Sequence, residues 1–191
     1  MTAKIGELWQ LYDEQGRALK ALGANKTDIF NKRLLHGASH VWIWRQTNKT
    51  AEILLQKRAA TKRTWPNLYD ISAAGHIDLE EDPLTAALRE TKEEVNLAIA
   101  EKDIKSIGIY RTLLVAPSGD VENEFQWLYL YKLSANQIFN LDQREVSKVE
   151  WKNLSSFKKD LIANPGKYVP HGPTYYKIIV SAIEREAEAI N

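Results

Sequence analysis

The stretch Gly75–Leu97, G-H-I-D-L-E-E-D-P-L-T-A-A-L-R-E-T-K-E-E-V-N-L, indicates more about this chain than any other part of it. Three glutamates, Glu90, Glu93 and Glu94, are spaced so that a helix would place their carboxylates on one face. Like charges at this spacing destabilise an isolated helix by roughly 0.2–0.5 kcal/mol per pair. Oxygen ligands without a nearby cysteine suit magnesium, with manganese as the alternative. The cluster therefore predicts a divalent-cation site.

The residues around these glutamates predict where a helix begins and ends. Asp82 is a favourable N-cap, and Pro83 suits the first helical position because no hydrogen-bond donor is needed there. Asn96 suits the left-handed conformation that ends many helices. The predicted packing face of the helix consists of Leu84, Ala87, Leu88, Thr91 and Val95.

The same stretch resembles the Nudix box, Gly-x5-Glu-x7-Arg-Glu-hydrophobic-x-Glu-Glu-x-Gly-hydrophobic. Thr91 departs from the hydrophobic position and Asn96 from the second glycine. The resemblance implies an α+β fold, an α/β/α sandwich with a central mixed sheet, and hydrolysis of a diphosphate bond. The positions that match, with every spacing kept, are Gly75, Glu81, Arg89, Glu90, Glu93, Glu94 and Leu97.

Composition excludes several classes of function. A net charge of +1 argues against binding of nucleic acid polymers or membranes by bulk electrostatic attraction. The absence of cysteine excludes disulfides, zinc-thiolate sites and thiol nucleophiles. Residues 1–6 show no secretory signal, and the apolar runs are too short to span a bilayer. We therefore expect a cytoplasmic protein that acts on a small molecule.

The length of 191 residues suits a single domain. We expect an N-terminal hairpin and linker over residues 1–35, a core over 36–170 and a C-terminal helix within 171–191. Strands without regular alternation around one central helix favour an α+β sandwich. Besides the hairpin strand Glu7–Asp13, the predicted strands are His40–Trp44, Ile53–Lys57, Tyr69–Ala74, Ile77–Leu79, Ile104–Leu114, Phe125–Tyr131 and Val146–Trp151, and two further predicted helices are Leu154–Ala163 and Pro173–Ala189.

The predicted helix gives each charged residue a role. Glu93 and Glu94 are the best candidate metal ligands, with Glu90 as third ligand or as the base that deprotonates water. A guanidinium grips a carboxylate at two points, so Arg89 is expected to orient Glu90 or Glu94. Gly75 lets the backbone pass close to the metal. The Nudix resemblance implies that the preceding carbonyl, here that of Ala74, joins the coordination shell.

Several candidates lie outside the box. In a strand, Glu122 and Glu124 would share one face, and the resemblance implies that one such acid adds a metal ligand or general base. We select Glu124 for this role. Arg58 and Lys62, in a basic loop, are candidates for binding substrate phosphate, although solvated surface cations are an equal alternative. A metal cluster also competes with the alternative of a simply solvated acidic helix face.

A wider resemblance covers about half of the chain. Several segments are similar to the Nudix branch that contains type I isopentenyl-diphosphate isomerases and related hydrolases. In those isomerases a cysteine before Gly-His performs proton chemistry, and Ala74 occupies that place here. His36, His76, Glu122 and Glu124 match part of the isomerase metal set. The matching segments are Leu35–His36, Leu55–Arg58, Lys62, Trp65–Pro66, Tyr69–Ser72, Gly75–His76 and Glu122–Phe125.

These observations support one main hypothesis and two rivals. The main hypothesis is a magnesium-dependent Nudix hydrolase whose substrate is a nucleoside diphosphate derivative or another organic diphosphate. The rivals are an isopentenyl-diphosphate isomerase and a catalytically silent module that binds a nucleotide. The N-terminal hairpin and the C-terminal helix are candidate surfaces for a homodimer.

Overall fold

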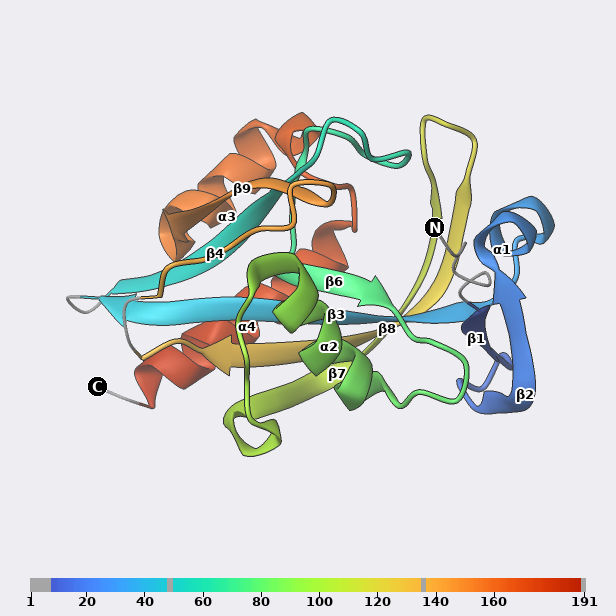
Figure 1. Cartoon of the computed structure of the whole chain (residues 1–191). Coiled ribbons are helices and arrows are strands. Elements are labelled where there is room, and N and C mark those ends of the chain that lie inside the picture. Colours follow the sequence, from blue (N-terminus) through green and yellow to red (C-terminus); the bar gives the residue numbers. More distant parts are fainter. Residues whose placement is uncertain (1–7, 48–49, 135–136, 190–191) are drawn as a thin grey trace.

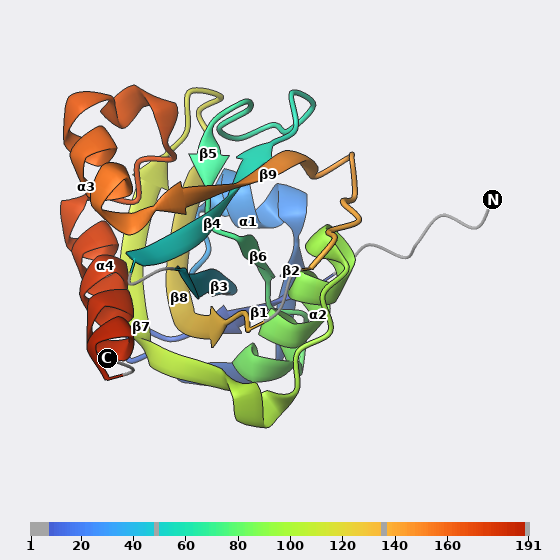
Figure 2. The same ribbon diagram turned by 90° about the vertical axis from the view of Figure 1, so that its left-hand side faces the viewer.

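The sheet is built around one long central strand, β3 (His36–Thr47), which crosses the whole molecule in Figure 1. The protein is represented by a computed structural model that describes residues 8–47, 50–134 and 137–189. Glu7, the tip of the predicted turn at 48–49 and the last two residues of the C-terminal segment lie outside the described residues. Within them, helix α2 (Pro83–Val95) lies on one side of the mixed sheet, opposite α3 (Leu154–Ala163) and α4 (Pro173–Glu188) (Figure 2). The predicted α+β sandwich is confirmed.

Strand β3 pairs with different partners along its two edges. One edge runs parallel to β8 (Val121–Lys132), in a register that begins at His36 opposite Glu124. The other edge is shared by β4 (Thr50–Arg58) and β6 (Ala73–His76), both antiparallel. The remaining strands are β1 (Leu8–Tyr12), β2 (Ala18–Asn25), β5 (Tyr69–Asp70), β7 (Ile104–Val115) and β9 (Val146–Asn153), and two short 3₁₀ helices span Glu101–Asp103 and Pro165–Lys167.

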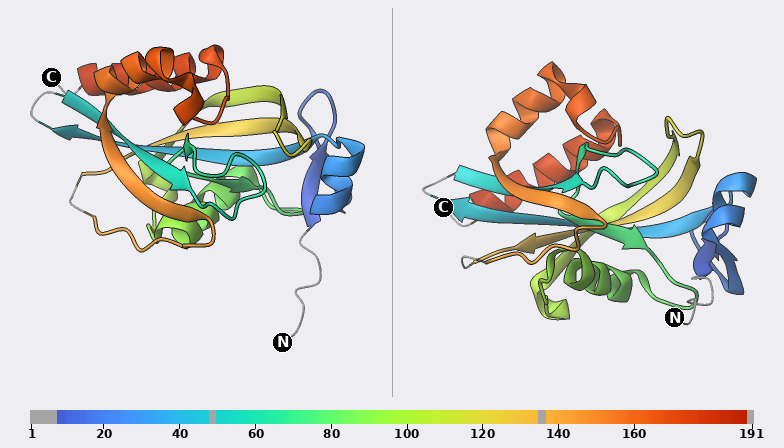
Figure 3. Two further views of the ribbon diagram at one scale, coloured as in Figure 1. Left: turned by 90° about the horizontal axis from the view of Figure 1, so that it is seen from above. Right: turned by 45° about the horizontal axis from the view of Figure 1, so that its top comes forward.

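Alternation along β3 divides the core between the two faces of the sheet. Trp42 and Trp44 pack with residues of α3 and α4. Val41 and Ile43 pack on the opposite face with Ala87 of α2. The right-hand view of Figure 3 shows the same division, with the helices separated by the sheet. This packing fixes α2 against β6, and the residues of β6 reach the same cleft as the acidic face of α2.

Helix α2 has the predicted ends. The Asp82 carboxylate accepts hydrogen bonds from the backbone N–H groups of Leu84 and Thr85, at 3.0 and 3.1 Å. Asn96 takes the left-handed conformation, with φ of 54°. Thr91, the polar residue on the packing face, is buried and donates its hydroxyl to the carbonyl of Ala87 at 2.7 Å. The departure from the box at Thr91 therefore leaves no unpaired hydroxyl.

Strand β2 pairs antiparallel with β1 and completes the expected N-terminal hairpin, whereas the helix α1 (Lys26–Lys32) was not predicted in the linker that follows. The signal for α1 is a local capping pattern. The side chain of Asn25 accepts a hydrogen bond from the backbone N–H of Asp28 at 3.0 Å. The buried Ile29 and Phe30 then pack against Trp9 of the hairpin.

Two strands predicted around Gly75 also differ. The segment Tyr69–Ala74 divides into β5 and the start of β6, because the Ser72 hydroxyl takes the place of a backbone partner. It donates to the carbonyl of Leu54 at 2.6 Å and accepts from the N–H of Ile43 at 2.8 Å. The predicted strand Ile77–Leu79 is irregular, since its backbone groups bond to β3 and β1 in turn. Gly75 itself lies inside β6.

Replacement of the helix cap tests the assignment of α2. Asp82→Ala should lower the free energy of unfolding by about 0.5–2 kcal/mol, because two N–H groups lose their acceptor. Asp82→Asn should retain most of the stability, since asparagine is an equally good N-cap. Urea unfolding followed by circular dichroism measures both variants. Equal stability of Asp82→Ala and the wild type would contradict the cap.

Candidate active site

A cleft of about 430 Å³ opens where the acidic face of α2 meets β6 and the first residues of β8. Carboxylates of α2 and of β8 line it. Residues of the N-terminal hairpin, α1, the loop after β4 and the segment before α4 line it as well. The predicted site residues that lie on this cleft are Arg58, Lys62, Ala74, Gly75, His76, Glu90, Glu93, Glu94, Glu122 and Glu124.

Gly75 and Glu90 lie so close together that a side chain at position 75 would force the Glu90 carboxylate to move. A Cβ atom added to Gly75 would lie 2.0 Å from Cδ of Glu90 and 2.1 Å from its Oε1. Real Cβ atoms essentially never approach that closely. Gly75 is thus required by the close approach of the Glu90 carboxylate and not by a turn in the backbone.

Arg89 holds two carboxylates of the box. Its guanidinium donates Nε and Nη2 to the two oxygens of Glu81, at 2.9 and 2.8 Å, and Nη1 to Oε1 of Glu90 at 2.6 Å. Nη2 also donates to the carbonyl of His76 at 2.9 Å. The hydrogen bonds that Arg89 donates to Glu81 raise the pKa of Arg89 above its ordinary value. Arg89 therefore orients Glu90 and ties α2 to the end of β6.

Glu93 and Glu94 lie in different environments. The side chain of Glu93 is 60% exposed, whereas Glu94 as a residue is only 6% exposed. Oε2 of Glu94 accepts a hydrogen bond from the backbone N–H of Ala74 at 2.9 Å. Burial, together with the nearby Glu90 charge, raises the pKa of Glu94 to about 8. A divalent cation at this position would favour the ionised carboxylate.

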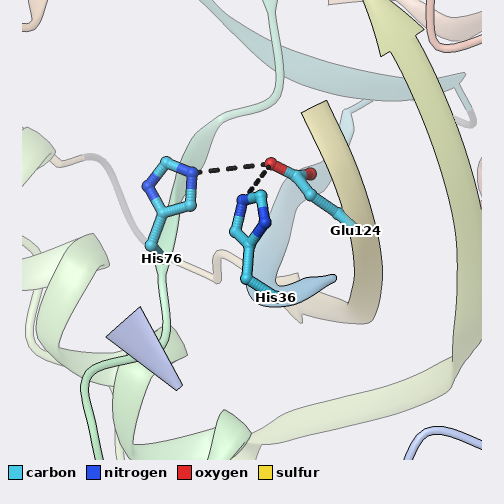
Figure 4. Close-up of side chains that lie close together, drawn as sticks. All are labelled: His36, His76 and Glu124. Atoms are coloured by element: carbon cyan, nitrogen blue, oxygen red, sulfur yellow. Dashed lines mark ion pairs between the residues drawn. The ribbon is translucent and has the colours of Figure 1, made fainter. Parts of the chain in front are cut away.

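A second group of potential ligands consists of His36, His76 and Glu124 (Figure 4). Nε2 of His36 lies 3.2 Å from Oε1 of Glu124, and Nε2 of His76 lies 3.5 Å from the same oxygen. Burial raises the pKa of Glu124, but the two histidines outweigh it and hold that pKa well below its ordinary value. Burial lowers the pKa of His76 to about 4. The three side chains come from β3, β6 and β8.

The chemistry of this group fits a bound cation. Nδ1 of His36 lies 2.9 Å from the carbonyl of Leu34, which can only accept a hydrogen bond, so Nδ1 carries the proton. In the tautomer with the hydrogen on Nδ1, the lone pair of Nε2 faces the Glu124 carboxylate, and Nε2 has no hydrogen-bond partner among the described residues. A metal ion bound between the two groups would remove this conflict. The group formed by His36, His76 and Glu124 could hold a metal ion.

Trp9 of β1 covers both histidines. Its ring stacks on that of His76, with centroids 3.5 Å apart and planes 7° apart, and on that of His36 at 5.5 Å. Trp9 is buried and lines the cleft. Sequence reasoning missed Trp9, because contact between the N-terminal hairpin and residues 36 and 76 has no local signal in the chain.

The basic candidates line the cleft but are already paired with acids. Arg58 donates Nη1 to Oδ2 of Asp70 at 2.9 Å and bonds to Thr64 as well. The ammonium group of Lys62 pairs with Glu145. These partners of Arg58 and Lys62 all lie outside the box helix. The cleft also includes residues that sequence reasoning did not select as ligands or substrate contacts: Lys26, Asp70, Gln126 and His171.

Comparison with known proteins places this geometry in a family. A model of the NUDIX domain matches residues 35–171. The chain belongs to the Nudix family. Nudix hydrolase 3 of Arabidopsis thaliana is 33% identical over 140 residues, covering 71% of this chain but only 18% of the plant protein. A Nudix hydrolase of Clostridium acetobutylicum is 27% identical, covering 93% of this chain and 97% of its own length. These relatives support the assignment of the chain as a Nudix hydrolase.

Other relatives carry a different name. Isopentenyl-diphosphate Delta-isomerase of Aliivibrio fischeri is 27% identical, covering 92% of this chain and 96% of the isomerase. This match supports the resemblance to the isomerase branch that the segments around Trp65 and Gly75 indicated. No helix among the described residues has the length and apolar run needed to cross a lipid bilayer.

Solved structures share the fold at low identity. A Deinococcus radiodurans crystal structure superposes with a TM-score of 0.65 at 17% identity, covering 94% of this chain and 98% of its own. A Caenorhabditis elegans Ap4A hydrolase gives a TM-score of 0.56 at 21% identity, covering 78% and 97%. The NUDIX domain of Shewanella oneidensis NrtR, solved with ADP ribose, gives 0.52 at 15%, covering 78% and 82%. At these identities the comparisons show the fold alone.

The glycine contact gives a direct test. Gly75→Ala should displace the Glu90 carboxylate and lower hydrolase turnover by about 10²-fold, because misplacement of a reacting group by about 1 Å is that costly. The affinity for the divalent cation, measured by titration calorimetry, should fall in parallel. Gly166→Ala is the matched control, since a Cβ there meets nothing within 4 Å. Normal turnover by Gly75→Ala would contradict the role of the contact.

The stacking of Trp9 can be tested by NMR. Trp9→Leu removes the indole ring current from His76, so the His76 ring protons should move downfield. The free energy of unfolding should also fall, by about 3 kcal/mol, because a large buried side chain is truncated. Trp9→Phe retains a ring and should show a smaller change in both measurements. Unchanged His76 resonances in Trp9→Leu would show that the two rings do not stack in solution.

Proposed function

We propose that the protein is a magnesium-dependent Nudix hydrolase that cleaves a diphosphate bond by attack of water at phosphorus. The observation that carries this proposal is the convergence of Glu90, Glu93 and Glu94 on one cleft together with Gly75 and Ala74. The substrate class is a nucleoside diphosphate derivative or another organic diphosphate. Family membership supports the hydrolase class, and the all-oxygen donor set supports magnesium, with manganese as the alternative.

The box glutamates are proposed as the metal ligands. Glu90, Glu93 and Glu94 offer carboxylate oxygens, and the carbonyl of Ala74 is the proposed backbone ligand. When bound, magnesium would neutralise the diphosphate oxygens and lower the pKa of a coordinated water. The Arg89 contact holds Glu90 in place, and the N–H of Ala74 holds Glu94. Both contacts fix the ligands before a cation arrives, which reduces the entropy lost on binding.

The chemical step requires a base and a leaving group. The oxygen of water forms a new bond to phosphorus, the bridging P–O bond breaks, and the departing phosphate takes the electron pair. The proton of the water passes to a carboxylate, for which Glu90 and Glu124 are the candidates. Arg58 and Lys62 are proposed to face the charge of the substrate phosphates, after exchange of their present acidic partners.

The assembly and the setting of this enzyme follow from the same proposal. The chain would act as a single domain on a small-molecule diphosphate, without a nucleic acid polymer or a membrane as partner. We infer a cytoplasmic location, which suits a chain without cysteine. A homodimer through the N-terminal hairpin or the C-terminal helix remains a prediction.

A second candidate function is isopentenyl-diphosphate isomerisation. Two observations favour it: relatives bear that name, and His36, His76 and Glu124 cluster in one place. Ala74 argues against it, because a methyl side chain cannot donate or accept the proton that allylic transfer requires. In deuterated water an isomerase incorporates deuterium into carbon, whereas a hydrolase releases phosphate. A silent nucleotide-binding module would bind ligand with magnesium and form neither product.

The main test is the substitution Glu94→Gln. Glutamine keeps a side-chain oxygen to accept the Ala74 N–H bond, so the protein should remain folded, with an unchanged circular dichroism spectrum. Loss of the charged ligand should reduce turnover by about 10²–10⁴-fold. Turnover is measured as phosphate released, after phosphatase coupling, from a panel of diphosphate compounds with magnesium. Near-normal phosphate release by Glu94→Gln would reject the assignment, and Glu101→Gln, outside the cleft, is the control.

A further inference from the structure

The inner wall of the cleft carries three buried polar atoms without a hydrogen-bond partner among the described residues. They are Nδ1 of His171, Oε1 of Gln126 and Nε1 of Trp65, and all three residues line the cleft. A buried polar atom left unpaired costs free energy, so each such atom in a native fold needs an explanation. Their concentration along one cleft points to a ligand rather than to three separate defects.

The proton on His171 is placed by its neighbour. Nε2 of His171 lies 2.8 Å from Oδ1 of Asp70, and the other oxygen of Asp70 accepts from Arg58 at 2.9 Å. A carboxylate can only accept, so Nε2 carries the hydrogen, and in the Nε2–H tautomer Nδ1 is an acceptor. The ring is also stacked on Tyr175, with centroids 4.6 Å apart. His171 is only 7% exposed and is held in one orientation.

Gln126 is oriented in the same way. Its Nε2 donates to Oε2 of Glu124 at 3.0 Å, which leaves Oε1 as the free acceptor of the amide. Gln126 is 1% exposed, so the bond to Glu124 is shielded from water. The third atom, Nε1 of Trp65, can only donate. The wall thus presents two acceptors and one donor, and none of them belongs to the box glutamates.

We propose that His171, Gln126 and Trp65 form an inner subsite for an uncharged part of the substrate that carries two hydrogen-bond donors and one acceptor. This proposal rests on the proposed function, because it assigns the part of a diphosphate substrate that the metal ligands do not hold. A hydrocarbon chain would leave all three atoms unpaired and is disfavoured. Two donors with an acceptor occur in a ribose diol and at the amino edge of an adenine base.

Two substitutions of His171 separate its acceptor from its contact with Asp70. In His171→Asn, the side-chain oxygen can stand where Nδ1 stands. In His171→Gln, the amide reaches the position of Nε2 and Asp70, but no atom occupies the place of Nδ1. Tyr176→Phe is the control for the stability of this segment. It removes a 2.6 Å bond to the carbonyl of Val169, and Tyr176 does not line the cleft.

Dissociation constants are measured by calorimetry with magnesium, using ligands whose bridging carbon prevents hydrolysis. The α,β-methylene analogue of ADP carries both kinds of donor, its 2′,3′-dideoxy form lacks the hydroxyls, and its purine riboside form lacks the amine. Isopentenyl methylenediphosphonate carries none. His171→Gln should raise the dissociation constant of the ADP analogue about tenfold, as expected for the loss of one hydrogen bond. The dissociation constant of the isopentenyl ligand should change by less than about twofold. His171→Asn should restore most of the affinity.

The modified ligands identify the donor. If the dideoxy form is insensitive to His171→Gln, the ribose diol binds the subsite; if the purine riboside form is insensitive, the amine does. The proposal is overturned if His171→Gln weakens the isopentenyl ligand equally, if it weakens no ligand, or if the wild type does not bind the ADP analogue. Failure of the proposed function is distinct, since it would show as absence of phosphate release from hydrolysable diphosphates while this binding pattern persists.

Discussion

The parallel pairing of β3 with β8 is the constraint on which the site depends. Its register sets His36 beside Glu124 and Ala38 beside Gln126, while the antiparallel pairing of β6 with β3 brings His76 next to Ala38. Alternation then places these polar side chains on the face that continues into the tryptophan core. A shift of one residue would send them to the opposite face, toward α2. Core packing and site geometry are therefore fixed by the same hydrogen bonds.

The buried carboxylates of the cleft all have compensating partners. Each buried carboxylate of the cleft is compensated in a different way: Asp70 by a guanidinium and an imidazole, Glu124 by two imidazoles, and Glu94 by a backbone N–H and a raised pKa. Buried charges need such partners, because desolvation is otherwise too costly. On α2 itself, Glu94 is held by the Ala74 N–H and Glu90 by the Arg89 guanidinium. Asp70 thus has its charge balanced by two side chains of the fold, whereas the proposed metal ligands Glu90 and Glu94 lie together on α2.

The sequence predicted local features well and long-range contacts poorly. Helix α2, with its cap at Asp82 and its end at Asn96, could be predicted because both signals lie within a few residues of the helix. The same holds for α3 and α4, and for most strands. The position of Trp9 over His76 could not be predicted, since it depends on how the hairpin docks. The pairing of Asp70 with His171 joins residues 101 positions apart, and no local pattern in the sequence predicts it.

The docking of the hairpin bears on how the functional unit is delimited. The family match begins at residue 35, yet Trp9, Lys26 and Phe30 line the cleft from earlier in the chain. A recombinant fragment trimmed to the matched boundaries would keep every box residue and still uncover both imidazoles to bulk water. Truncation at the matched boundaries would thus remove part of the wall of the cleft while the box sequence stayed intact.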